Sequence, residues 1–348
     1  MQLSLIFVFG ILSLYCGGTM KKICFIVFFV FYIFFISVNN VYAYDLNKRE
    51  EIFTPAFQLL WDDFKNLISV KKINFVGLDP KVAKVLNSCP FSSSDISDDS
   101  YYKIVAPKSF ELKAKIQREI FEKFGETSKL LDDIDWTQNS LNEYILYALL
   151  KKNIEFPVEF DVLDSQPFNG SKDNYKYFGA GHGAQRFANQ VKPLFYEYSW
   201  DYAVSLETKS GDRVILYRTS SPENVYDLYS QIDKKTTRQL KFGESDKLII
   251  PFISLNERIE YDSLCGRKIY DTKFVIAKAI EDVEFKLDNM GAKLRNEAVM
   301  DVVKMSIPLP GRGKVFDFSK PFVLYLVEKD KSLPYFAIRI NDAKFLVK

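Results

Sequence analysis

Histidine is almost absent from this chain of 348 residues, which carries one, His182, within FGAGHGAQRF. That scarcity excludes most catalytic sites that need a histidine base, unless His182 is the base. It also excludes the common histidine-based metal sites. The neighbouring Gly179, Gly181 and Gly183 suggest a phosphate cradle, but no buried strand leads into them and no helix follows directly. We therefore predict a glycine-rich surface turn, no metal, no cofactor and no enzymatic activity.

Cysteine is scarce as well, because two of the four cysteines lie in an apolar N-terminal segment. Cys89 and Cys265 remain beyond that segment and permit one disulfide at most, which excludes a scaffold held by several disulfides. Whether these two pair is left open by the sequence. An excess of one charge is also lacking, since 47 Lys and Arg stand against 45 Asp and Glu. Without a basic stripe, nucleic acid is not an expected partner.

Residues 1–43 are predicted to be a signal peptide. The stretch MKKICFIVFFVFYIFFISVNNVYA begins at Met20 with two lysines, continues as an apolar run and ends in a small-x-small pattern at Ala43. Met20 is therefore the expected true start, and the protein is expected to be exported, either secreted or periplasmic. The alternative is an uncleaved membrane anchor, because the apolar run is just short of the roughly 20 residues that a span needs.

The rest of the chain, residues 44–348, is predicted to form one α+β domain. Apolar residues at helical spacing favour a helix over 57–68, and a second helix is expected to begin at an Asp79 cap with Pro80 in its first turn. Another is expected to begin at Ser221 and Pro222. Alternating or continuous apolar segments predict strands, mostly late in the chain: SWDYAVSLET, DRVILYR, KLIIPFISL, VEFKLD, FVLYLVE and YFAIRI. Helices early and antiparallel strands late indicate the α+β class.

One late segment has no clear periodicity. NEAVMDVVKMSIPLPGRGKVFDFSKPF, residues 296–322, passes through three prolines and two glycines before the strand FVLYLVE begins. Its prolines and glycines are typical of an exposed segment that a protease can cut.

The C-terminal third resembles the serpins, and most visibly their antitrypsin-like members. The similarity is carried, in one order and register, by IIPFISLNERIEYDSLCG, VEFKLDNMG, KMSIP, FDFSKPFVLYLVEK and LPYFAIRI. The spacing from Gly291 to Met305 equals that between the hinge glycine and the cleaved residue of antitrypsin-like serpins. The resemblance implies helices packed on a large main β-sheet with smaller sheets beside it, and an exposed reactive-centre loop at about 289–315. The short loop at 89–101 leaves no room for the helices that serpins place there, so the resemblance implies a shortened member of that family.

The resemblance also implies a function and a bond. A serpin is a suicide inhibitor of a serine or cysteine protease, whose cleaved loop inserts into the main sheet; the alternative is a non-inhibitory serpin-fold binding protein whose loop is only a substrate. By register the attacked bond is Met305–Ser306, which suits elastase-, chymotrypsin- or cathepsin-like proteases. A slip of one residue gives Lys304–Met305 and a trypsin-like target. The protein is expected to act as a monomer, with the target protease as its partner.

Insertion requires a hinge with small or apolar side chains on alternate residues. In GAKLRNEAVMD the inward set is Ala292, Leu294, Asn296, Ala298 and Met300, after Gly291, and the charged side chains fall on the opposite face. The preceding strand has its inward set at odd numbers, so a bend at Gly291 is expected to change the parity. Leu294 is bulky for this role. Burying the Asn296 amide without a partner would cost about 1–3 kcal/mol, which favours the non-inhibitory alternative.

Overall fold

Four α-helices form where apolar side chains recur once per turn, in the part of the chain that the computed structural model describes: residues 52–136, 140–181, 184–236, 240–276, 278–294 and 313–348. They are α3 (Pro55–Leu67), α4 (Lys81–Ser88), α5 (Phe110–Phe124) and α6 (Val225–Lys235). In α3 the side chains of Phe57, Trp61 and Phe64 are buried, as the helical spacing predicts. No helix in these ranges is long and apolar enough to cross a membrane. The predicted signal peptide and His182 lie outside the described residues.

The boundaries of two helices differ from the sequence predictions. Helix α4 begins at Lys81 with Pro80 as its cap, and the Asp79 carboxylate instead accepts a hydrogen bond from the backbone N–H of Phe75 (2.6 Å). Helix α6 begins at Val225, where the Asn224 side chain accepts from two backbone N–H groups of the first turn. Both helices therefore begin later than predicted, at Lys81 because Asp79 bonds to Phe75 and at Val225 because Asn224 is the residue that caps the first turn.

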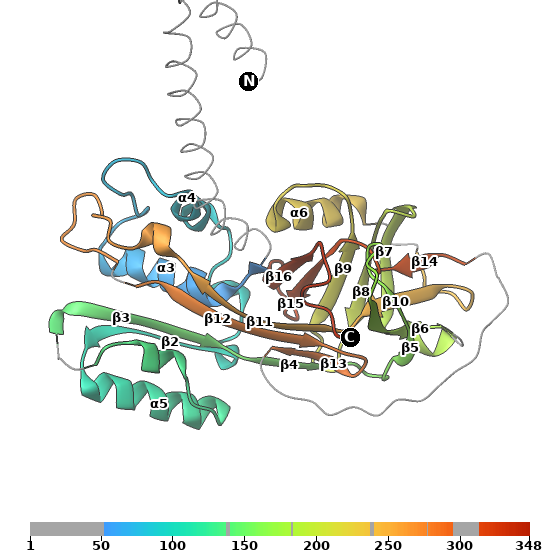
Figure 1. Cartoon of the computed structure of the whole chain (residues 1–348), viewed down its shortest axis with the longest axis horizontal. Helices are drawn as coiled ribbons and strands as arrows, with labels where there is room; N and C mark the ends of the chain where they lie inside the picture. The colour runs from blue at the N-terminus through green and yellow to red at the C-terminus, as the bar shows by residue number, and fades with distance from the viewer. Residues whose placement is uncertain (1–51, 137–139, 182–183, 237–239, 277, 295–312) are drawn as a thin grey trace, which may run out of the picture. The chain divides into compact units, whose positions relative to one another are not determined.

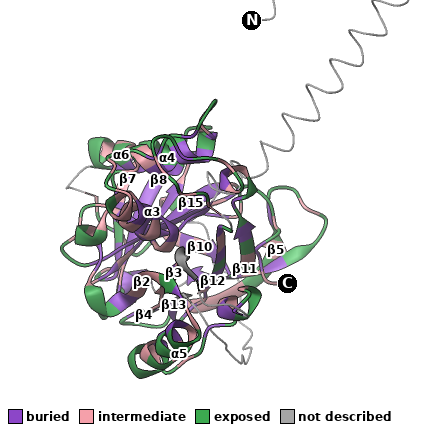
Figure 2. Cartoon of the chain, turned by 90° about the vertical axis from the view of Figure 1, so that its left-hand side faces the viewer, coloured by how far each residue is buried: buried purple, intermediate pink, exposed green. Residues whose placement is uncertain are grey.

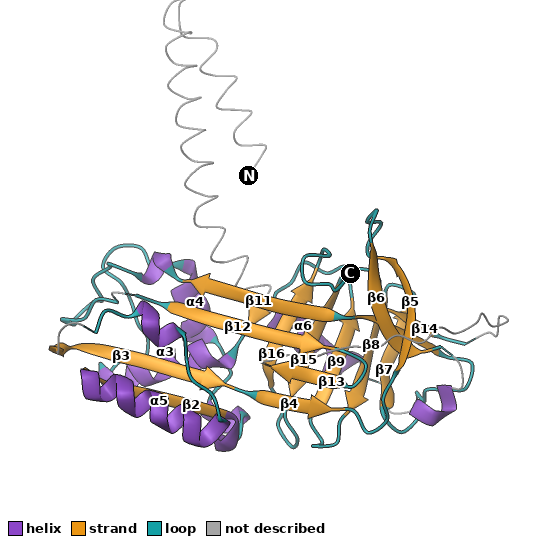
Figure 3. Cartoon of the chain, turned by 60° about the horizontal axis from the view of Figure 1, so that its bottom comes forward, coloured by secondary structure: helices purple, strands orange, loops and turns teal. Residues whose placement is uncertain are grey.

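The main sheet consists of two groups of strands, and a strand of one group leads almost directly into a strand of the other. One group has the order β11 (Ile253–Glu260), β12 (Ile280–Leu287), β13 (Gly291–Leu294) and β4 (Lys152–Glu155). The other pairs β2 (Tyr101–Lys108) with β3 (Ser140–Leu150). Since β3 leads into β4 after a single residue, both groups lie in one layer, as Figure 3 shows.

Two smaller sheets lie beyond this layer (Figure 1). The six-stranded sheet has the order β1 (Ile52–Phe53), β16 (Pro334–Ile340), β15 (Phe322–Val327), β9 (Arg213–Arg218), β8 (Asp201–Glu207) and β7 (Val191–Tyr198). The four-stranded sheet has the order β14 (Val315–Asp317), β10 (Lys247–Pro251), β6 (Asn174–Ala180) and β5 (Asp161–Pro167). Helices on a main sheet with smaller sheets beside it confirm the predicted α+β fold class. Residues 48–348 form one compact unit.

The predicted glycine-rich surface turn is wrong for Gly179. This residue lies within β6, and a Cβ there would sit 1.9 Å from the carbonyl oxygen of Leu248 on β10. Glycine is therefore required by the close approach of two backbones inside a sheet. β6 forms a hairpin with β5, and the turn of this hairpin is confined to residues 168–173.

Two hydrophobic cores hold the layers together, visible as buried regions in Figure 2. The larger joins the back of the main sheet to α3 and to the six-stranded sheet. The smaller lies on the other face of β3, where Ile145 and Tyr147 pack against Leu112, Ile116 and Ile120 of α5. Because side chains of a strand alternate between faces, odd-numbered residues of β3 face α5 and even-numbered ones face the larger core.

Candidate functional site

A tight hairpin joins β12 to the hinge strand β13. The Asp288 carboxylate accepts hydrogen bonds from the backbone N–H groups of Met290 (2.9 Å) and Gly291 (3.1 Å), and the Asp288 N–H donates to the Gly291 carbonyl (2.9 Å). An aspartate that bonds to the backbone two residues ahead is a common way to fix a turn. The chain therefore reverses over Asp288–Met290. The bend lies just before Gly291 and not at Gly291, where the sequence predicted it.

Gly291 is instead the first residue of β13, and its glycine identity has a different cause. A Cβ at this position would lie 1.9 Å from the carbonyl oxygen of Ile154 on β4. No side chain can occupy that space without separating the two strands. Glycine thus permits β13 to lie directly against β4.

The hinge strand β13 pairs antiparallel with a strand on each side. Ala292 lies opposite Leu287 of β12 and Ile154 of β4, and its side chain is fully buried. Val283, Phe285 and Leu287 are buried on β12, so the inward parity changes from odd to even across the turn. Leu294 ends β13, opposite Lys152. Asn296, Ala298, Met300, Lys304, Met305 and Ser306 lie outside the described residues.

Beyond Leu294 the main sheet is divided by a cavity of about 470 Å³, here called the slot. Residues 146–150 of β3 form one wall and residues 280–284 of β12 form the other. The floor comes from the first turns of α3, and residues 128–130 line the outer side. In the described part of the chain, no strand pairs β3 with β12.

The slot continues the register of β13. Extending the pairing Leu294↔Lys152 brings residues 296–300 opposite 150–146 of β3. Extending Lys293↔Lys286 brings residues 295–299 opposite 284–280 of β12. These wall segments are the ones that line the slot. The slot therefore has the length and register of the next six residues of the chain.

A buried carboxylate lies at one wall of the slot. Glu281 of β12 is on the inward face and 6% exposed. It accepts hydrogen bonds from the Thr54 hydroxyl, at the start of α3, and from the Tyr261 hydroxyl (2.9 Å). Burying a carboxylate is costly unless donors compensate it, and these hydroxyls do so. The sequence did hold a signal for Glu281. The inward-facing residues of β12 are 281, 283, 285 and 287, and Glu281 is the acidic one in this otherwise apolar set.

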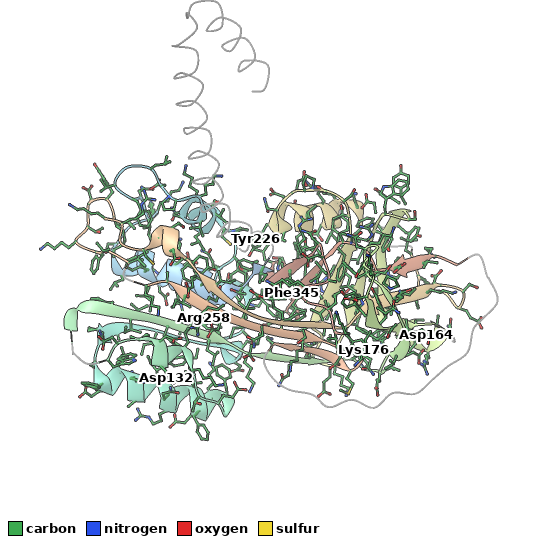
Figure 4. The ribbon with its side chains drawn as sticks, viewed as in Figure 1. Asp132, Asp164, Lys176, Tyr226, Arg258 and Phe345 are labelled. Carbon is green, nitrogen blue, oxygen red and sulfur yellow. The ribbon has the colours of Figure 1, made fainter. Side chains whose placement is uncertain are left out.

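An ion pair closes the outer side of the slot. Asp133, in the short helix η3 (Leu130–Asp133) beyond α5, accepts from the Arg258 guanidinium of β11 (2.8 Å). Arg258 also makes a two-point contact with Asp282 of β12 (2.7 and 2.9 Å), and these hydrogen bonds raise the pKa of its guanidinium. Figure 4 labels Arg258 and the neighbouring Asp132 on the two sides. The pair links the α5 side of the slot to the β11–β12 side; sequence analysis missed it because the partners are far apart in the chain.

A second charged cluster lies behind β4, at the closed end of the slot. The Lys152 ammonium contacts the carboxylates of Glu328 (2.8 Å) and Asp212 (3.3 Å). Burial raises the pKa of Glu328, but the hydrogen bonds from Lys152 and Ser97 outweigh it and hold that pKa below its usual value. This cluster fixes β4, and through it β13, to the six-stranded sheet.

Comparison with known proteins finds no matching family model and no matching curated protein. Among the solved structures that are similar to this chain are the following three. Serpin48 from the insect Tenebrio molitor has 16% identity and a TM-score of 0.42, over 83% of this chain and 90% of that one. Thyroxine-binding globulin in complex with thyroxine has 10% identity and a TM-score of 0.49, over 85% and 94%. The thermophilic serpin tengpin in its native state has 10% identity and a TM-score of 0.40, over 72% and 76%.

Proposed function

We propose that this chain is a serpin-type suicide inhibitor whose cleaved loop fills the slot of its own main sheet. The observation that carries the proposal is the register. β13 already pairs with β12 and β4, and the walls of the slot are the segments that residues 295–300 would meet next. The sequence resemblance to serpins independently implies such an insertion.

The chemistry begins at Met305–Ser306. The nucleophile of a target protease attacks the carbonyl carbon of Met305, the bond to the nitrogen of Ser306 breaks, and that nitrogen gains a proton as it leaves. Met305 then stays linked to the enzyme as an ester, or as a thioester for a cysteine protease. The inserted strand forms main-chain hydrogen bonds with both walls of the slot. Its insertion pulls the bound enzyme along and distorts the enzyme's active site. Water must not release the enzyme before insertion is complete.

The residue before the bond sets the target. Met305 is unbranched and apolar, so an elastase-, chymotrypsin- or cathepsin-like pocket would accept it. If the attacked bond is instead Lys304–Met305, the pocket must supply an acidic group for the ammonium, as trypsin-like enzymes do. The inhibitor meets such an enzyme outside the cell, consistent with the predicted signal peptide.

Two observations favour a second candidate, a non-inhibitory protein whose loop is cleaved as a substrate. Glu281 puts a carboxylate on the inward face, opposite the position that Ala298 would take, and the Asp133–Arg258 pair must yield as the sheet closes. Both slow insertion. A slow insertion gives water time to hydrolyse the acyl-enzyme.

The test is incubation with elastase-like, chymotrypsin-like and trypsin-like proteases, followed by a denaturing gel and mass spectrometry of the released peptide. We expect a band at the summed mass that survives denaturation, with cleavage after Met305. Matched variants, Met305→Ala and Lys304→Ala, separate the two bonds. Cleavage without the band, accompanied by no rise in melting temperature, would refute insertion. Cleavage without the band but with that rise would identify the substrate-only alternative.

A further inference from the structure

Four large apolar side chains are exposed near α4, at some distance from the slot. They are Val76 (53% exposed), Leu78 (77%), Tyr270 (61%) and Val275 (51%). Single exposed apolar residues are common on protein surfaces, but a contiguous group of them marks an interaction site. Whether these four form a group depends on how residues 74–78 and 266–276 are arranged.

Backbone pairing places the four on one surface. Phe75 pairs with Ile269, and both side chains are buried. Because neighbouring side chains in paired segments alternate between faces, Val76, Lys268 and Tyr270 point the other way, to solvent. Lys268 in turn pairs with Val275, which brings Val275 onto the same outer surface.

Further contacts hold Leu78 beside this surface. The Val76 N–H donates to the Lys268 carbonyl (2.8 Å), and the Arg267 guanidinium donates to the Leu78 carbonyl (2.9 Å). Gly77, with φ of 91°, forms the turn between the two apolar residues. We call this surface the tip: Val76, Leu78, Lys268, Tyr270 and Val275. Figure 2 views the molecule from the end where α4 and the segment before β12 lie.

The surroundings of the tip are basic. Residues 70–89 and 262–278 together carry eight Lys and Arg against three Asp, an excess of five positive charges, whereas the whole chain has a net charge of +2. The remaining residues are therefore net negative. Exposed lysines at 71, 72, 81, 84, 268 and 273 lie in the same two segments of the chain as the apolar side chains.

Exposed apolar side chains in segments rich in exposed lysine match the chemistry of an anionic bilayer surface. Lysines are drawn to anionic headgroups, while aliphatic and tyrosine side chains partition into the interface below them. We propose that the tip docks the folded protein reversibly on membranes that carry anionic lipids. A soluble polyanion or an acidic protein would use the lysines but would give Leu78 and Tyr270 no apolar contact.

The docking needs neither the slot nor the reactive bond, so it stands independently of the proposed inhibition. It would hold the chain at a membrane surface by its folded part, whatever becomes of the N-terminal segment. All proteins compared below must share one N-terminus, verified by mass spectrometry, so that the segment before residue 44 contributes equally to each.

The test is sedimentation with vesicles of phosphatidylcholine alone or of phosphatidylcholine mixed with phosphatidylglycerol. We expect binding to the anionic vesicles only, released by high salt because the attraction is screened. Lys268→Gln should weaken binding about fivefold, the loss typical for one lysine near an anionic surface. Leu78→Ser should weaken it about tenfold by removing an inserted aliphatic side chain. Both positions are exposed, so the melting temperature should not change.

Matched controls carry the same changes elsewhere. Trp200→Ser removes an aromatic side chain that is 54% exposed on the turn between β7 and β8, and Lys172→Gln removes an exposed lysine on the β5–β6 hairpin. Neither should alter binding. The proposal is overturned if anionic vesicles do not bind, or if the controls weaken binding as much as the tip variants. It is also overturned if Leu78→Ser has no effect while dextran sulfate binds as well as vesicles, which would assign the lysines to a soluble polyanion.

Discussion

If the proposed inhibition holds, a single substitution on the inward face of the hinge should convert the protein from an inhibitor into a substrate. In the register of β13, residue 298 would lie between Ala148 of β3 and Glu281 of β12, on the inward face. Ala298→Asp would place a second carboxylate beside the buried Glu281. A buried charge without a compensating partner costs about 3–5 kcal/mol.

That cost is large on the scale of a rate. Since 1.36 kcal/mol corresponds to a factor of ten, insertion that passes through this arrangement should slow by about 100-fold or more. Deacylation does not depend on residue 298, so the partition of the acyl-enzyme should shift from covalent complex to cleaved protein. The assay is the ratio of these two bands on a denaturing gel at a fixed amount of protease.

The matched control is Val299→Asp, which makes the same charge change one residue later. Its side chain would face the outer side of the sheet, where Lys129 lines the slot, so the covalent complex should persist. If both variants lose the complex equally, the loss is not due to the inward face. If only Val299→Asp loses it, the register is displaced by one residue. If neither does, the loop does not enter the slot, and the reasoning is refuted.

Three further predictions concern the described residues around the slot. Gly291→Ala should lower the free energy of unfolding by about 1–3 kcal/mol, because its Cβ would overlap the Ile154 carbonyl; thermal unfolding measures this. Asp133→Asn should accelerate insertion about two- to threefold, because an exposed pair with Arg258 contributes about 0.5 kcal/mol; stopped-flow fluorescence of a labelled loop measures this. Glu328→Gln should make the free energy of unfolding depend less on pH in the acid range. The pKa of Glu328 is lower in the folded protein than its unfolded value of about 4.3, so this carboxylate stabilises the fold above that pH. The stabilisation is lost as the pH falls through the folded pKa.

Each of these has its own control. Gly181→Ala meets only the end of the Leu163 side chain, at 3.3 Å, and should leave the melting temperature nearly unchanged; a drop as large as that of Gly291→Ala would contradict the close approach at β4. Asp132→Asn, one residue earlier, should not alter insertion, and an equal acceleration would argue against the specific pair. A Glu328→Gln profile parallel to that of the unaltered protein between pH 7 and pH 3 would show that another group causes the acid loss.

Much of the fold followed from local patterns. The buried stripe of α3 recurs at helical spacing, and the inward residues of β12 alternate, so each could be predicted from its own segment. The hairpin of β5 and β6 was missed, because its residues follow no simple alternation and its pairing depends on β10 as well. Helix starts were displaced by a few residues where side chains such as Asp79 bond outside the helix.

The sequence by itself predicted the alternation of the hinge and the candidate bonds at Met305 and Lys304, and it provided the glycine at position 291. Only the tertiary structure decided that this glycine lies directly against β4. The slot depends on β3 and β12, which are separated by more than a hundred residues, and Glu281 is held by Thr54, 227 positions away. Periodicity reports which face of a segment is buried, because burial follows the repeat of the local backbone. It cannot report which distant segment covers that face, because that is selected by the packing of the whole core.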